Sequence, residues 1–139
     1  MSRASIRREI RRYEKLKSES EDRLRELEEQ LEHLLDFRSR YNAGKQEFND
    51  NLSNRKKRAD SVREMSEQVK CGQVYYERMN DDLTGEKNVK AMHYVERVSE
   101  RIESVKKLLE YEIEQEKLKI HNYSERIEEL YRRLSREDD

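Results

Sequence analysis

The stretch NDDLTGEKN, residues 80–88, decides the fold that the sequence predicts, because it interrupts a chain that otherwise has the pattern of helix. The 139 residues include no proline and only three glycines. Gly85 can adopt a left-handed backbone conformation without steric cost. Thr84 is a candidate N-cap, and Glu86 would follow in the first helical turn, where the helix dipole favours an acidic side chain. We therefore expect the main reversal of the chain at residues 81–88.

A heptad repeat of apolar side chains occupies the first half of the chain. Counted by sevens from Ile6 to Leu83, ten of twelve positions are apolar or aromatic, which is typical of a helix in a left-handed supercoil. The second core position is weaker and includes Arg38 and Lys45, so this helix needs partners of other shapes. Gly44 costs a helix only about 1 kcal/mol, which favours a continuous or bent helix. A turn at Gly44, giving three helices, is the alternative.

A second seam of apolar residues, spaced three and four apart, follows residue 88. Where two spacings of four occur in a row, the helix carries apolar residues on two faces. One face has Val105, Leu109 and Ile113. The other has Leu108, Tyr111 and Leu118. Because a two-helix hairpin can bury only one of these faces, we expect the second to be an exposed strip that marks an interface.

Charge supports a reversal at Gly85. Folding there places residue i near residue 170−i, so the basic block 87–107 faces the acidic segment 63–83. Exposed ion pairs contribute only ~0–1 kcal/mol each, and the pattern therefore indicates register rather than stability. The expected fold is all-α: an elongated antiparallel helical hairpin or coiled coil. It would be one domain, residues 1–139, with a long helix at about 5–81, a turn at about 81–88 and a second helix at about 89–135.

The sequence predicts no catalytic, cofactor-binding or metal-binding residues, so we do not expect an enzyme. Its three histidines do not converge in this register, and three isolated glycines cannot form a phosphate-binding loop. The net charge of −1 argues against nucleic acid as a partner. The basic run NRKKR, residues 54–58, is interpreted as a solvated face opposite an acidic helix. No segment has the length and apolarity of a membrane span or a signal peptide, so we expect a cytoplasmic protein that does not insert into membranes.

The turn Leu83-Thr84-Gly85, followed by a charged residue, resembles the Trp-x-Gly helical hairpins of type VII secretion. More narrowly, the chain is similar to the small helical proteins encoded beside LXG-domain toxins in Gram-positive bacteria. Those proteins tend to have a coiled N-terminal helix, a hairpin turn and a C-terminal helix with regularly spaced isoleucines and leucines, which corresponds here to residues 101–134. Leu83 stands where the family has tryptophan, and Gly85 matches its glycine.

The resemblance implies a non-catalytic accessory protein, without a cofactor, that binds the helical N-terminal region of an LXG toxin. It would act as a chaperone or targeting factor in the cytoplasm, with export alongside its partner by a route independent of a signal peptide as a further option. A second small helical protein could join the complex. The alternative function is a homo-oligomeric coiled-coil adaptor unrelated to secretion, for which a homodimer is expected. The candidate partner-binding residues are Leu108, Tyr111, Leu118, Tyr123 and Ile127.

Overall fold

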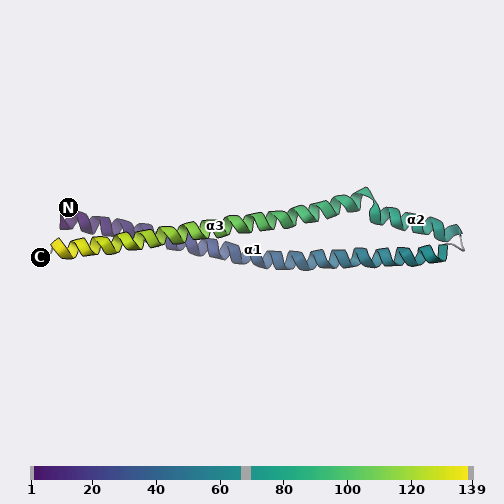
Figure 1. The fold of residues 1–139 in the computed structure, drawn as a ribbon, viewed down its shortest axis with the longest axis horizontal. Helices are drawn as coiled ribbons and strands as arrows, with labels where there is room; N and C mark the ends of the chain where they lie inside the picture. The colour runs from purple at the N-terminus through teal and green to yellow at the C-terminus, as the bar shows by residue number, and fades with distance from the viewer. Residues whose placement is uncertain (1, 67–69, 138–139) are drawn as a thin grey trace. The chain divides into compact units, whose positions relative to one another are not determined.

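A computed structural model describes residues 2–66 and 70–137 of the chain. It contains three helices: α1 (Arg3–Ser66), α2 (Lys70–Thr84) and α3 (Glu86–Glu137) (Figure 1). Every described residue except Ser2 and Gly85 is helical. The all-α class predicted from the sequence is therefore confirmed.

The chain divides into two units. The first combines Met1–Leu35 with Ser104–Asp139, and the second is Asp36–Glu103. In each unit the helices pair antiparallel, as in a helical hairpin or an antiparallel coiled coil (Figure 1). That the whole chain behaves as one domain stays a prediction.

Two small apolar clusters form the core of the first unit. In each cluster, buried side chains of α1 meet buried side chains of α3, and half-buried apolar residues pack around them. One cluster consists of Ile6, Ile10 and Leu130. The other consists of Leu27, Leu109 and Ile113. Ion pairs between the two helices, such as Arg23 with Glu112 at 3.7 Å, lie beside these clusters.

The heptad seam predicted from Ile6 to Leu83 is confirmed for the part from Ile6 to Leu52. Both core positions of the repeat are buried or half-buried without exception from Ile6 to Leu52. Two polar core positions, Arg38 and Lys45, form ion pairs across the helix pair of the second unit. Arg38 lies 3.1 Å from Glu103, and Lys45 lies 2.7 Å from Glu96. At these two positions the aliphatic part of a long side chain lies on the seam, and its charged end reaches the side of the helix pair.

The predicted reversal at residues 81–88 is wrong. In the second unit the Tyr41 hydroxyl donates a hydrogen bond to the carbonyl oxygen of Val95 at 2.8 Å. Their residue numbers sum to 136, whereas a fold at Gly85 requires 170. Nearer the end of α1, the Arg63 guanidinium lies 5.7 Å from the ring centroid of Tyr76 in α2. The arm that pairs antiparallel with α1 therefore consists of α2 followed by α3.

The predicted helix over 5–81 is accordingly two helices, because α1 ends at Ser66 and α2 begins at Lys70. The second predicted helix, 89–135, corresponds to α3. The alternative of a turn at Gly44 is wrong, since α1 is helical on both sides of this residue and through it. The heptad position at Val69 lies outside the described residues.

Gly85 separates two helices, but by a geometry other than the one expected. No glycine in the described residues has a positive φ, so the break does not use the left-handed conformation. The Gly85 carbonyl oxygen accepts a hydrogen bond from the backbone N–H of Val89 at 3.2 Å, which makes Gly85 rather than Thr84 the N-cap residue of α3. The Thr84 hydroxyl instead donates to the carbonyl oxygen of Asn80 at 2.7 Å, at the end of α2. Glu86 lies in the first turn of α3, as predicted.

Replacing Gly44 and Gly85 by alanine should change stability in opposite directions. A Cβ atom at Gly44 would meet no heavy atom within 4 Å, so Gly44→Ala should raise the free energy of unfolding by about 1 kcal/mol. A Cβ atom at Gly85 would lie 2.5 Å from the Asp81 carbonyl oxygen, and Gly85→Ala should therefore be destabilising. Urea unfolding followed by circular dichroism measures both changes. Loss of stability in Gly44→Ala would contradict an ordinary continuous helix at this position.

Candidate functional site

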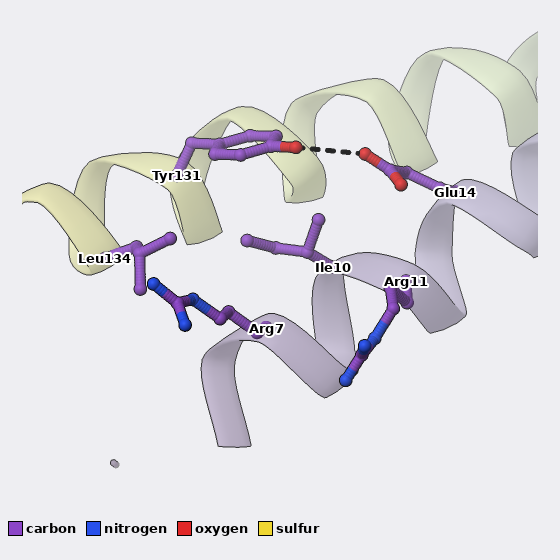
Figure 2. Close-up of a pocket in the computed structure, with 6 residues that line it drawn as sticks. All are labelled: Arg7, Ile10, Arg11, Glu14, Tyr131 and Leu134. Atoms are coloured by element: carbon purple, nitrogen blue, oxygen red, sulfur yellow. Dashed lines mark hydrogen bonds between the residues drawn. The ribbon is translucent and has the colours of Figure 1, made fainter. Parts of the chain in front are cut away.

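The described residues form several surface hollows but no candidate metal centre. No group of three histidine, cysteine, aspartate or glutamate side chains among them could hold a metal ion. A hollow of about 290 Å³ lies where the first turns of α1 meet the last turns of α3 (Figure 2). Its volume is close to the lower end of the roughly 300–1,000 Å³ that is usual for small-molecule sites, and a larger hollow of about 430 Å³ lies beside Phe37 and Tyr41. No described helix has the length and apolarity that crossing a membrane requires.

A hydrogen bond between the two helices lies beside this hollow. The Tyr131 hydroxyl donates to a carboxylate oxygen of Glu14 at 3.1 Å (Figure 2). This bond favours the protonated phenol, and it raises the pKa of Tyr131 above its usual value. Tyr131 is therefore part of the pairing of α1 with α3 rather than a group poised for proton transfer at neutral pH.

Exposed apolar side chains, rather than cavities, are the notable feature of the surface. Leu108, Tyr111 and Leu118 are 56%, 62% and 54% exposed. The opposite stripe of the same segment is turned toward α1, where Leu109 and Ile113 contact the buried Leu27. The sequence-based expectation that only one of the two apolar faces is buried is confirmed.

The exposed stripe is longer than these three residues. Positions spaced alternately four and three apart along α3 are all exposed and all uncharged, in a chain in which 45% of residues are charged. We call this set the α3 strip: Ser104, Leu108, Tyr111, Gln115, Leu118 and Asn122. The other exposed residues between 104 and 122 are all charged, apart from His121. The α3 strip is therefore a second heptad seam bordered by charge, as expected of a surface that receives another helix.

The α3 strip and the buried seam lie on nearly opposite sides of one helix. An α-helix turns by about 100° per residue, which places the centre of the strip about 160° from the line of Leu109 and Ile113. A helix bound on the strip therefore does not compete with α1 for space. This arrangement explains the two apolar faces that the sequence shows in this segment.

The remaining two candidate residues do not belong to the strip. Tyr123 is half-buried, and its ring centroid lies 6.1 Å from that of Tyr13 in α1. Ile127 is also half-buried on the seam that faces α1. Both residues thus serve the pairing of α1 with α3, and the structure groups only Leu108, Tyr111 and Leu118 into one surface.

The predicted turn motif lies elsewhere, in the second unit. Leu83 is half-buried and borders a hollow that Arg55, Arg58 and Tyr75 also line. Thr84 and Gly85 form the junction between α2 and α3. The motif therefore positions two consecutive helices and does not contribute to the α3 strip.

An apolar groove in the second unit was not anticipated from the sequence. Phe37 is about half exposed and stacks on Tyr41, with ring centroids 6.1 Å apart. The groove beside them also includes Gly44, Phe48 and Val95. Phe37 could have indicated the groove in the sequence, because this aromatic residue directly precedes the seam position at residue 38 and does not itself belong to the seam.

Comparisons of the chain with protein-family models, curated proteins and solved structures give no match. The class of protein therefore rests on the fold and the surface: an all-α hairpin protein of coiled-coil type with an exposed, uncharged strip on α3.

Proposed function

We propose that this protein is a non-catalytic helical accessory protein that binds a helix of a partner protein on the α3 strip. The observation that supports the proposal best is the strip itself, a second heptad seam that nothing in the chain covers among the described residues. Interface energy is usually concentrated in a few large side chains. Leu108, Tyr111 and Leu118 are large, exposed and aligned, so they are the expected anchors.

A helix is the partner element that this geometry fits. Spacings of three and four residues present side chains in a row to a facing helix, where they insert between four residues of the partner. An extended strand or a flat surface would use only part of such a row. The partner should therefore contribute an amphipathic helix.

The resemblance to the small proteins encoded beside LXG toxins supplies the class of partner for this proposal. The α3 strip lies within residues 101–134, the C-terminal segment that carries part of that resemblance. The partner would be the helical N-terminal region of an LXG toxin, which the protein shields and helps to present for type VII secretion. The turn motif adds no support, because Gly85 does not lie at the reversal of the chain.

Copurification with the toxin tests this function. The full chain, without a tag, should copurify with the tagged N-terminal helical region of the LXG toxin encoded beside it. The melting temperature of the complex should exceed that of the free chain, because a partner that binds only the folded state stabilises it. Absence of an LXG gene beside the gene for this chain, or absence of copurification, would contradict the assignment to type VII secretion.

A further inference from the structure

The charged residues on both sides of the α3 strip indicate which helix binds it. We propose that a second copy of this chain binds the strip, with the two α3 helices parallel and in register. The inference rests on the proposed function only in that it uses the same strip as a docking surface. The second copy would cover the strip while no other partner is bound.

The heptad positions of the strip follow from its spacing. Leu108, Gln115 and Asn122 occupy a positions. Ser104, Tyr111 and Leu118 occupy d positions. The flanking g positions are then Lys107 and Glu114, and the flanking e positions are Glu112 and Lys119. All four flanking residues are exposed or half-buried, so each can reach a helix that lies on the strip.

Parallel pairing brings opposite charges together along both edges. In a parallel two-stranded coiled coil, a g residue faces the e residue about five positions later on the other helix. Lys107 of one copy then faces Glu112 of the other, and Glu114 faces Lys119. Because the dimer is symmetric, each contact occurs twice. Three of these residues already have ion-pair partners in their own copy: Glu112 lies 3.7 Å from Arg23, Glu114 lies 3.6 Å from Lys117, and Lys119 lies 3.3 Å from Glu116. The side chains of Glu112, Glu114 and Lys119 remain at least 40% exposed, so these weak pairs do not prevent contacts with a second copy.

Antiparallel pairing brings like charges together. With maximal overlap of the strip, g faces g and e faces e. Glu114 would then face Glu114 of the second copy, and Glu112 would face Glu112. The two orientations therefore differ in the sign of these contacts, and the charge pattern selects the parallel dimer.

The polar members of the strip agree with a parallel pair. A polar side chain at an a position meets its own counterpart in a parallel, in-register dimer, and asparagine there is known to specify register at a cost in stability. Asn122 and Gln115 occupy such positions. The next flanking pair, His121 with Arg126, does not bring opposite charges together, so the seam ends at Asn122. We therefore expect a reversible dimer that a partner helix can replace, with binding of the two occupants mutually exclusive.

Charge exchange tests the orientation without changing the apolar strip. In sedimentation equilibrium, the full chain should show a monomer–dimer equilibrium. Glu114→Lys and Lys119→Glu should each raise the dimer dissociation constant about tenfold, because each variant turns two attractive contacts into repulsive ones. The double variant Glu114→Lys/Lys119→Glu restores opposite charges and should return the constant to within about twofold of the original.

Cross-linking tests the register. In a Cys71→Ser background, which removes the single cysteine, Gln115→Cys should form a disulfide between copies under mild oxidation, because position 115 faces itself in the parallel dimer. Glu110→Cys is the matched control: Glu110 is also exposed on α3 but lies outside the strip, and it should cross-link much more slowly.

Three results would overturn the proposal: a chain that stays monomeric up to its solubility limit, a double variant no better than the single variants, or equal cross-linking at 110 and 115. None of these results bears on copurification with the LXG toxin. Conversely, a dimer with the expected charge behaviour supports self-pairing even if no toxin copurifies.

Discussion

Replacing Leu108, Tyr111 and Leu118 together by glutamate should weaken every interaction at the α3 strip by at least about 100-fold, because these side chains are its only large apolar anchors. Each introduced carboxylate would also have to lose water against an apolar helix without gaining a partner. The free chain should keep its helicity, since all three side chains are more than half exposed. Titration calorimetry with the toxin region and sedimentation of the chain alone measure the two kinds of binding, and circular dichroism measures the helicity.

A matched control separates the strip from a general effect of added charge. Val74, Tyr75 and Met92 are exposed to a similar degree, at 47%, 56% and 48%, and lie outside the strip. Their joint replacement by glutamate changes the net charge by the same amount and should leave binding within about twofold, because surface residues outside an interface contribute little. Equal losses in the two triple variants would refute the α3 strip as the docking surface. Unfolding of the strip variant alone would show that the strip is packed in solution.

The seams of this chain could be predicted from its sequence because burial on a helix follows a period that the sequence displays directly. The positions from Ile6 to Leu52 and the exposed stripe at Leu108 follow from spacing alone. Predicting that the stripe at Leu108 is exposed required one further physical argument: one partner helix can cover only one face of α3. Both arguments concern local geometry, in which neighbours along the helix determine the outcome.

The reversal could not be predicted in the same way. The heptad register continues without a shift from Val62 in α1 to Tyr76 and Leu83 in α2, although these helices run in opposite directions. Both arms of a hairpin need an apolar seam, so an unbroken register fits one long helix and a hairpin equally well. The segment between the arms has no proline, and the sequence offered Gly85 as a stronger signal. A glycine can end one helix and begin the next without reversing the chain, and it does so here.

The charge pattern failed for a related reason. Alternating blocks of opposite sign pair acceptably in more than one register, and each exposed pair contributes too little to choose among them. The structure realises pairs such as Arg38 with Glu103, and Arg126 with Glu9 at 3.6 Å, in a register shifted from the expected one. Apolar contacts and the Tyr41 hydrogen bond determine the register instead. Exposing the apolar side chains to water would cost free energy, and the hydrogen bond requires one particular geometry.

Leu27→Ala should lower the free energy of unfolding by about 3 kcal/mol. Leu27 is only 1% exposed and lies against Leu109 and Ile113 of α3. Its removal leaves a gap between two helices whose shared core consists of two small clusters, so few other contacts in the first unit can compensate. Urea unfolding monitored by circular dichroism measures the loss.

Leu118→Ala provides the comparison, since it deletes the same atoms from the exposed face of α3. At concentrations where the chain is monomeric, it should change the free energy of unfolding by no more than about 0.5 kcal/mol. The same substitution should weaken binding at the α3 strip, whereas Leu27→Ala should affect binding only through the fraction of folded chain. The two leucines therefore separate the two seams: one holds the hairpin together, and the other is available to a helix from outside. Equal destabilisation by the two substitutions would contradict this division, because it would require Leu118 to be packed within the folded chain.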